Sequence, residues 1–351
     1  MTHLAVPEFF SWQDAISPPI LDVRSPGEFA KGHIPGAVNL PLFEDSERAE
    51  IGTLYKRQGP DLALERGLEI VGPKMASLLR KGKALATQGQ VRIHCWRGGM
   101  RSQSVAQLLK AGGLNVATLQ GGYKAYRNWT RQALTKPLQL VILGGKSGSG
   151  KTELLHGLAQ AGEQILDLEG LAQHKGSVFG GLGQEAQPSS EHFSNLLHQK
   201  LTELDRTRRI WVEDESLMIG RVCIPEPFWQ QMKEAPTMVI EASLDSRVKR
   251  LLADYGHCAP EKVTAAFLRI KKRLGGQNLK EALAAVEEGA PEKAARIALR
   301  YYDKAYSYGL EQRPSSKVVY LDLTHLALQA SVAKLLQSVE TIPDSSKPQT
   351  S

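Results

Sequence analysis

Short apolar runs alternate with longer amphipathic stretches along most of the chain. The runs that predict β-strands are residues 20–24, 91–95, 116–119, 138–143, 164–168, 209–213, 237–242 and 318–323. Apolar residues recur at helical spacing over 102–110 and 151–161 and over most of 246–308. Strands that alternate with helices favour a mostly parallel sheet covered by helices. The pattern therefore predicts an α/β protein.

Two domains are expected for a chain of 351 residues. Pro137 follows a predicted helix that ends near Lys136, and a new apolar strand begins directly after it. We place the domain boundary there, with one domain over 1–136 and a second over 137–340. The second domain includes a basic helical region at about 247–310. Residues 341–351 are rich in Pro, Ser, Lys and Thr and are predicted to be a disordered tail.

The composition excludes several classes of protein. The sequence has no run of about 18 apolar residues, which argues against a membrane span. Its first residues lack the basic and apolar regions of a signal peptide, so we expect a cytoplasmic protein. The three cysteines, Cys95, Cys223 and Cys258, are too few for a disulfide scaffold. Without a CxxC pair, no structural metal site is expected.

Positive charge is concentrated in two regions of the sequence. Residues 1–136 and 247–280 each carry a net charge of +7, whereas 137–246 carry −6. Clustered basic charge suits a polyanionic partner such as RNA, although a single basic cluster is equally well explained as a solvated helix surface. The candidate RNA contacts are Arg247, Lys249, Arg250, Arg269, Lys272 and Arg273. The spacing of the last three predicts that they share one face of a helix.

The segment Gly145-Lys146-Ser147-Gly148-Ser149-Gly150-Lys151-Thr152 matches the P-loop pattern GxxxxGK[ST]. An apolar strand precedes it and a predicted helix follows it, as a P-loop requires. We expect phosphate to be bound by Gly145, Ser147, Gly148, Ser149, Gly150, Lys151 and Thr152, with Thr152 able to ligate Mg²⁺. Glu213 or Asp214, after the strand at 209–213, is expected to hold Mg²⁺ or a water, and the sequence does not separate the two.

A second loop carries a cysteine among cations and glycines. Cys95-Trp96-Arg97-Gly98-Gly99-Met100-Arg101-Ser102 joins a predicted strand to a predicted helix. A helix N-terminus and two nearby arginines both favour the thiolate form of Cys95. We therefore expect Cys95 to be a nucleophile and Arg97 and Arg101 to hold an anion beside it.

The motifs around this loop resemble a rhodanese domain over most of residues 5–130. They are Leu21-Asp22-Val23-Arg24-Ser25-Pro26-Gly27-Glu28-Phe29, Gly32-His33-Ile34-Pro35-Gly36-Ala37, the Cys95 loop and Gly121-Gly122-Tyr123. In one respect the chain departs from the pattern, since five residues separate Cys95 from Arg101 where many rhodaneses have four. The longer loop resembles that of Cys-dependent phosphatases.

Rhodanese and P-loop together are similar to the bacterial tRNA 2-selenouridine synthase family over nearly the whole chain. Further matching motifs are Asp167-Leu168-Glu169-Gly170-Leu171-Ala172, His174-Lys175-Gly176-Ser177-Val178-Phe179-Gly180 and Glu213-Asp214-Glu215-Ser216. The resemblance implies a rhodanese-like parallel-sheet domain followed by a P-loop NTPase-like α/β domain with a helical segment. It also implies that sulfur is replaced by selenium in 2-thiouridine at the wobble position of tRNA, with selenophosphate as donor. S-geranylation of the same base by geranyl diphosphate is associated with the family.

These implications yield a two-site hypothesis. The P-loop holds geranyl diphosphate, and the thiouridine sulfur attacks its allylic carbon. Cys95 takes selenium from selenophosphate, and the selenium then displaces geranylthiol from C2 of the base. The anticodon stem-loop of tRNA is the expected partner, no tightly bound cofactor is expected, and Mg²⁺ is a candidate ion. His174 and Lys175 are candidates for a substrate loop.

Three other interpretations fit parts of the sequence. An ATP-dependent tRNA thiolation enzyme or kinase would use the P-loop for a nucleotide. A regulatory NTPase would use its rhodanese module only to bind a partner, so Cys95→Ser would be harmless. A Cys-dependent phosphatase would turn over simple aryl phosphates.

Overall fold

The computed structural model describes residues 2–13, 15–314 and 317–340. The chain divides into two compact units, Met1–Leu134 with Ser194–Gln199, and Thr135–Phe193 with Lys200–Ser351. The predicted tail at 341–351 lies outside the described residues. In the described part of the chain, no helix is both long and apolar enough to cross a membrane.

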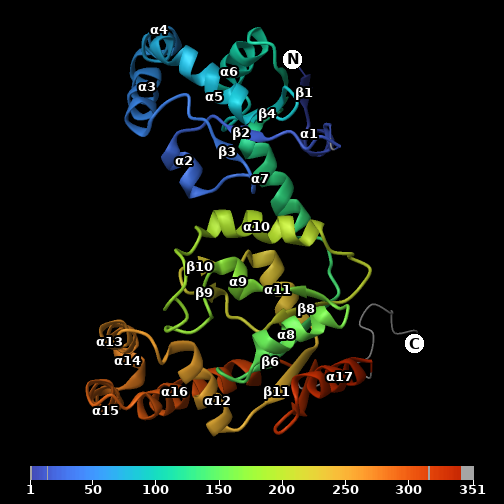
Figure 1. Ribbon diagram of the computed structural model, residues 1–351, viewed down its shortest axis with the longest axis vertical. Coiled ribbons are helices and arrows are strands. Elements are labelled where there is room, and N and C mark those ends of the chain that lie inside the picture. Colours follow the sequence, from blue (N-terminus) through green and yellow to red (C-terminus); the bar gives the residue numbers. More distant parts are fainter. Residues whose placement is uncertain (1, 14, 315–316, 341–351) are drawn as a thin grey trace. The chain divides into compact units, whose positions relative to one another are not determined.

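The first unit is built on a five-stranded parallel sheet with the order β1-β5-β4-β2-β3 (Figure 1). The strands are β1 (Thr2–Leu4), β2 (Ile20–Asp22), β3 (Val38–Asn39), β4 (Gln90–His94) and β5 (Asn115–Leu119). The helices are α1 (Val6–Ser11), α2 (Pro26–Lys31), α3 (Asp45–Gln58), α4 (Pro60–Val71), α5 (Met75–Leu85), α6 (Met100–Ala111) and α7 (Gly122–Ala133), with a 3-10 turn at Gly72–Lys74.

The inner strands β2, β4 and β5 are buried on both faces, as in other parallel sheets covered by helices. One face packs Leu21, Val91 and Ile93 against the apolar sides of α5 and α6. The other face, with Ile20, packs against α1 and α7. The carboxyl ends of β2 and β4 are adjacent, so the segments that follow them meet at one edge of the sheet.

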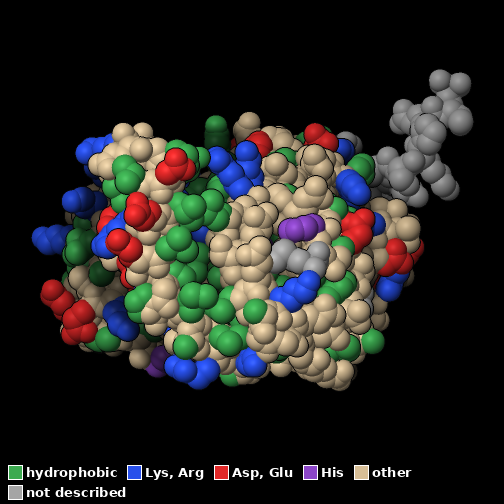
Figure 2. Space-filling model, turned by 90° about the horizontal axis from the view of Figure 1, so that it is seen from above, with side chains coloured by type: hydrophobic (Ala, Val, Ile, Leu, Met, Phe, Trp, Pro, Cys, Tyr) green, Lys and Arg blue, Asp and Glu red, His purple; other side chains and the backbone are tan. Residues whose placement is uncertain are grey.

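Exposed apolar side chains remain on the helices of the first unit. Tyr55, Leu68 and Met75, from α3, α4 and α5, are among the large hydrophobic side chains that stay exposed. Figure 2 shows one face of the molecule, on which hydrophobic side chains form a band beside acidic and basic ones. Helices α3, α4 and α5 were not predicted from the sequence.

The second unit has its own five-stranded parallel sheet, with the order β12-β11-β6-β8-β7. Its strands are β6 (Leu140–Gly145), β7 (Gln164–Leu166), β8 (Ile210–Glu213), β11 (Thr237–Glu241) and β12 (Val318–Asp322), and a separate hairpin joins β9 (Met218–Ile219) to β10 (Val222–Cys223). Outside the region 244–311, the helices of this part of the chain are α8 (Lys151–Gln160), α9 (Leu168–Ala172), α10 (Ser190–Thr202), α11 (Glu226–Glu234) and α17 (Leu328–Val339). Each apolar run predicted as a strand contains one, and the predicted α/β fold is confirmed.

The basic region is a helical subdomain with its own apolar core. It consists of α12 (Leu244–Tyr255), α13 (Pro260–Arg269), α14 (Lys271–Leu274), α15 (Gly276–Glu287) and α16 (Pro291–Glu311). Phe267, Ala282 and Ile297 are buried in that core. One detail of the prediction was wrong. Arg269 ends α13, whereas Lys272 and Arg273 lie on α14, so the three do not share one helix face.

The middle of α10, Ser194–Gln199, is grouped with the first unit because its polar side chains are satisfied there. Asn195 is fully buried and donates to the Tyr123 hydroxyl at 2.8 Å and to the His33 carbonyl at 2.7 Å. Arg127 donates to the Asn195 side-chain oxygen at 2.5 Å. This pairing could not be predicted from sequence, because the partners are remote along the chain.

Candidate functional site

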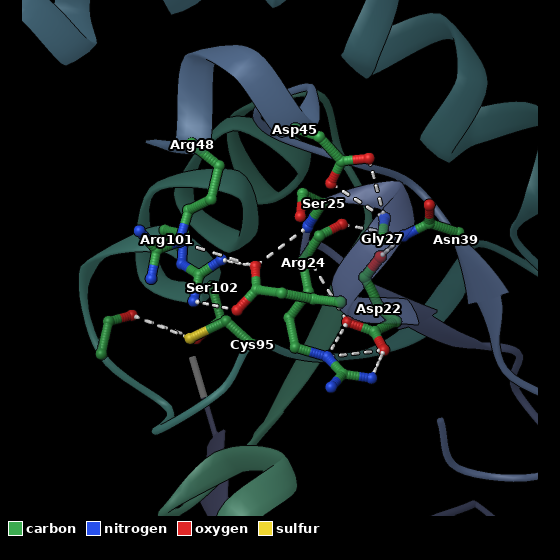
Figure 3. A network of polar contacts seen from close by, with 12 residues as sticks. Asp22, Arg24, Ser25, Gly27, Asn39, Asp45, Arg48, Cys95, Arg101 and Ser102 are labelled. Carbon is green, nitrogen blue, oxygen red and sulfur yellow. Dashed lines mark hydrogen bonds and ion pairs between the residues drawn. The ribbon is translucent and has the colours of Figure 1, made fainter. Parts of the chain in front are cut away.

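The Cys95 loop joins the end of β4 to the start of α6 in the first unit. Cys95 is 3% exposed, and its Sγ lies 3.2 Å from the Ser102 hydroxyl (Figure 3). The Ser102 hydroxyl also lies 3.0 Å from the Gly99 carbonyl oxygen, to which it can donate. A hydroxyl in this position can instead donate to a thiolate. Ser102 is therefore a residue of the site for which no role was predicted from the sequence.

Arg101 is held by a carboxylate from another element. Its guanidinium donates to both carboxylate oxygens of Glu28, on α2, at 2.6 and 3.3 Å. Burial raises the pKa of Glu28, but the hydrogen bond and charge of Arg101, aided by the Ser25 amide, outweigh burial and hold that pKa below its usual range. Glu28 is therefore ionised at neutral pH and orients Arg101. Arg97 is exposed and forms no ion pair with the described residues.

A buried polar pair supports the loop from behind. Arg24 forms a bidentate pair with Asp22, with a shortest distance of 2.6 Å, and its guanidinium lies 3.9 Å from the centre of the Tyr123 ring. Burial raises the pKa of Asp22, but His94 and Arg24 more than compensate and lower it below its usual value. An ionised Asp22 thus fixes Arg24, and both are fully buried beneath the site.

A glycine turn packs directly against the cysteine loop. Gly122 has φ +59°, and a Cβ placed on it would lie 2.5 Å from the Cys95 carbonyl oxygen. The Tyr123 amide donates to that same carbonyl at 2.9 Å, and the Lys124 amide donates to the Trp96 carbonyl at 2.9 Å. Only glycine permits this approach, so the Gly121-Gly122 motif has a structural reason in the shape of the loop.

The P-loop runs from β6 to α8 in the second unit. Gly148 and Gly150 have positive φ values of 75° and 92°, which turn the backbone around the loop. Lys151 donates to the Gly145 carbonyl at 2.8 Å. The Ser149 hydroxyl is buried and has no hydrogen-bond partner among the residues that the structure describes. An unsatisfied buried hydroxyl within a ring of backbone amides suits a bound oxyanion.

Both acidic candidates have partners within the protein, and Asp214 lines the pocket around the P-loop. Asp214 forms an ion pair with Arg313 at 2.5 Å. Glu213 is fully buried, and one of its oxygens accepts the Leu168 amide at 3.1 Å. Burial and the charges of Asp167 and Glu169 raise the pKa of Glu213 well above its usual value. The shift favours the protonated, neutral form of the Glu213 carboxyl.

Glu169 and Glu215 also bring carboxyl groups to the P-loop pocket. The Thr152 hydroxyl donates to Glu169 at 3.2 Å, and both glutamates line the P-loop pocket. Burial raises the pKa of each, and a hydrogen bond joins them, which requires that one carboxyl be protonated. In the part of the chain that the structure describes, no three His, Cys, Asp or Glu side chains gather as a metal site.

The P-loop opens into a pocket of about 1590 Å³ that lies within the second unit. One end is the phosphate loop. Aromatic and aliphatic side chains form another part of the wall, among them Trp229, Tyr301, Tyr302, Tyr306 and Leu310. The pocket therefore offers anion-binding and apolar surfaces side by side.

The six predicted RNA contacts separate into three groups. Arg247 is only 3% exposed, and its guanidinium donates to the Ser147 carbonyl and pairs with Asp303. It supports the P-loop from within, so its assignment to an RNA-binding surface was wrong. Arg250, Arg269 and Arg273 line the pocket, whereas Lys249 and Lys272 are exposed away from its lining.

The predicted substrate loop also borders the pocket. His174 is largely buried, and its Nδ1 has no partner among the described residues. Burial lowers the pKa of His174, and the charge of Arg269 lowers it further, so the ring is neutral at pH 7. Lys175 pairs with Asp254 of α12 at 2.6 Å, which ties this loop to the helical subdomain.

The fold and the two loops define a class of protein in which a rhodanese-like domain with a loop cysteine precedes a P-loop domain. The rhodanese-like domain model matches residues 7–128, and the model of the tRNA 2-selenouridine synthase AAA domain matches residues 138–332. The chain belongs to the tRNA 2-selenouridine synthase family.

Individual relatives match over most of their length. A tRNA 2-selenouridine synthase of Shewanella denitrificans is 36% identical over 84% of this chain and 89% of its own. One from Sulfurovum sp. is 35% identical over 86% of this chain and 91% of its own. The N-terminal domain of a putative ATP/GTP binding protein from Clostridium difficile 630 is 37% identical over 36% of this chain and 98% of its own, with a TM-score of 0.33.

Proposed function

We propose that this protein converts 2-thiouridine at the wobble position of tRNA to 2-selenouridine, with selenophosphate as selenium donor. One observation carries the proposal: a nucleophile loop and a phosphate loop occur in one chain that is 34–36% identical to tRNA 2-selenouridine synthases over at least 84% of its length. The enzyme is a transferase that acts first through the second unit and then through the first.

The pocket of the second unit binds geranyl diphosphate. Backbone amides of the P-loop and the Lys151 ammonium neutralise the diphosphate, and the aromatic wall accommodates the apolar chain. Mg²⁺ prefers oxygen ligands, and the Thr152 hydroxyl and the Glu169 carboxyl, 3.2 Å apart, would hold it there. A bound Mg²⁺ would add positive charge beside the leaving diphosphate.

In the first step, the sulfur of 2-thiouridine bonds to C1 of the geranyl group and the C1–O bond breaks, releasing diphosphate. The base simultaneously loses its N3 proton, because C2 becomes doubly bonded to N3. The ionised member of the Glu169–Glu215 pair, which lines the same pocket, accepts that proton. S-geranylation turns the sulfur into a good leaving group and C2 into an electrophile.

In the second step, selenium replaces the geranylated sulfur at the Cys95 site. Arg97, which is exposed, and Arg101, oriented by Glu28, attract the selenophosphate anion. The tRNA is bound by exposed cations such as Lys249 and Lys272, whose phosphate contacts position the RNA without reading its bases. The target base has to leave its stack to react.

The test is mass spectrometry of nucleosides from a 2-thiouridine anticodon stem-loop incubated with the protein, selenophosphate and geranyl diphosphate. Wild type should form 2-selenouridine. If the base stays unchanged and ATP is consumed on addition of tRNA, the selenium function is wrong and a nucleotide-dependent enzyme replaces it. If Cys95→Ser is as active as wild type, the rhodanese module has no chemical part in the reaction.

A further inference from the structure

The transfer of selenium to Cys95 as a perselenide, the step expected from sequence, does not balance in electrons. Selenium in selenophosphate is already at the oxidation level of selenide, and a cysteine thiolate is equally reduced. A bond between sulfur and selenium would form only if a pair of electrons left. None of the three substrates of the proposed reaction is an oxidant. A balanced role for Cys95 must therefore leave selenium reduced.

We infer that Cys95 accepts the phosphoryl group of selenophosphate and not its selenium, an inference that rests on the proposed function for the identity of the donor. The thiolate forms an S–P bond, the P–Se bond breaks, and the electron pair leaves with selenium as the hydroselenide ion. Water then cleaves the S–P bond, which releases phosphate and returns the Cys95 thiolate. No atom changes its oxidation level.

The hydroselenide ion released at the site is the nucleophile for the base. It forms the C2–Se bond as the C2–S bond to the geranylated sulfur breaks. The proton on selenium passes to the departing geranylthiolate, and N3 takes a proton from water. The products are 2-selenouridine, geranylthiol and phosphate.

The geometry of the loop suits a phosphoryl acceptor. Helix α6 begins at Met100 after Gly99, without a side-chain cap, so the first amides of this 12-residue helix are available to oxygens of a bound anion. Cys95 lies just before that helix, with five residues between it and Arg101. A tetrahedral group attacked by Cys95 would have its oxygens at the helix N-terminus and its phosphorus at the sulfur.

Ser102 is placed to make the Cys95 sulfur both a nucleophile and a leaving group. Its hydroxyl is buried and lies 3.2 Å from Sγ, within reach for an O–H donor to a thiolate. The thiolate is the attacking species in the first half-reaction and the departing species in the second. The thiolate must be stabilised when it attacks selenophosphate and again when it leaves phosphorus, and the Ser102 hydroxyl can donate to it in both steps.

Arg101 is preorganised for an anion with several oxygens. Glu28 grips its guanidinium through two hydrogen bonds, at 2.6 and 3.3 Å, and Arg48 lies 3.6 Å from the same carboxylate. The remaining N–H groups of the Arg101 guanidinium can donate to phosphoryl oxygens, whose spacing matches guanidinium geometry. Cys95 itself is almost fully buried, so only a small donor reaches it.

The test uses the full-length protein with two probes, selenophosphate and its sulfur analogue thiophosphate. Samples are denatured rapidly, and the Cys95 peptide is weighed. Thiophosphate separates the alternatives, because a phosphoryl adduct and a single transferred sulfur atom differ widely in mass. We expect a phosphoryl adduct on Cys95 in the wild type and none in Cys95→Ser.

Ser102→Ala supplies a readout that a merely structural role would not change. Selenophosphate is supplied in excess, so that formation of the adduct is not limiting. Without the hydroxyl, the thiolate then leaves about tenfold more slowly when water cleaves the S–P bond, and the phosphoryl adduct accumulates. Ser104→Ala, an exposed position on the same helix, is the matched control and should leave the adduct at its wild-type level.

Two results would overturn the inference. One is selenium or sulfur without phosphorus on Cys95. The other is the absence of any adduct in both wild type and Ser102→Ala while phosphate is released from selenophosphate. Nucleosides are analysed in parallel: 2-selenouridine without a phosphoryl adduct refutes the inference and leaves the proposed function standing. An adduct without any change of the base refutes the proposed function and leaves phosphoryl transfer standing.

Discussion

The Cys95 loop and the P-loop are the same structural solution used for two kinds of chemistry. Each follows the carboxyl end of an inner strand of a parallel sheet, turns through glycines and enters a helix at its N-terminus. Both backbones can bind oxyanions there. The first loop adds a thiol and a hydroxyl to that cradle, whereas the second adds Lys151 and Thr152 and has no strong nucleophile. In both loops the backbone accounts for the binding of an oxyanion, whereas the side chains that each loop adds determine which reaction can take place there.

The carboxyl groups around the two loops differ in the opposite sense. Beside Cys95, Arg101 keeps the pKa of Glu28 low, so its charge serves to fix a cation. Beside the P-loop, burial raises the pKa of Glu169 and of Glu215, and the hydrogen bond between them requires a shared proton. The surroundings of each carboxyl group therefore decide whether it is a charged partner for an arginine or one half of a proton-sharing pair.

The largest effect is expected from Cys95→Ser, which removes the thiol of the first loop and leaves the P-loop unchanged. A serine hydroxyl is not ionised at neutral pH, so 2-selenouridine formation should fall by roughly 10³-fold or more. Geranylation, which depends on the other loop, should continue, and the S-geranyl nucleoside should accumulate in the mass spectrum. An equal loss of both products would mean that the two loops do not divide the steps.

Lys151→Ala is the reciprocal change. Loss of a charge-assisted contact to the leaving diphosphate should slow geranylation by roughly 10–100-fold. When S-geranylated stem-loop is supplied directly, this variant should form 2-selenouridine at the wild-type rate. A variant that remains slow with that substrate would place Lys151 in the second step as well.

Glu28→Gln removes the ion pair that orients Arg101 but leaves the arginine itself in place. We expect about a tenfold loss of 2-selenouridine formation, since a charged hydrogen bond of this kind is worth roughly 1.5–3 kcal/mol. Glu69→Gln is the control, because Glu69 pairs with Arg66 on the exposed surface at 2.8 Å and such pairs contribute little. Similar losses in the two variants would contradict a specific role for Glu28.

The smallest effect concerns the stability of the second unit. The folded-state pKa of Glu213 lies well above its usual value of 4.5, so the protein loses stability as pH rises from about 4.5 toward that folded-state pKa. Glu213→Gln removes this loss and can still accept the Leu168 amide. The melting temperature of the variant should therefore match wild type near pH 4.5 and exceed it increasingly at higher pH, by on the order of 2–4 °C for each kcal/mol gained. A difference that shrinks as pH rises would contradict the assignment.

Much of the fold was predictable because the information is local. Most of the predicted strands are short apolar runs buried within a parallel sheet, and each loop motif is contiguous with its strand and helix. Helices α3, α4 and α5 were missed because several of their large apolar side chains stay exposed, which blurs the helical pattern.

By itself, the sequence determined the two loops, their order and the α/β class, since strand, glycine turn and helix N-terminus are encoded within a few neighbouring residues. The tertiary structure alone decided the electrostatic partners. Glu28 reaches Arg101 across 73 positions, Asp214 reaches Arg313 across 99, and Arg247 reaches the Ser147 carbonyl across 100. Burial and ion pairing depend on which distant segments the fold brings together. For that reason the sequence could propose Glu213, Asp214 and Arg247, whereas only the packed structure brings Glu28 and Ser102 to the Cys95 loop and Glu169 and Glu215 to the P-loop pocket.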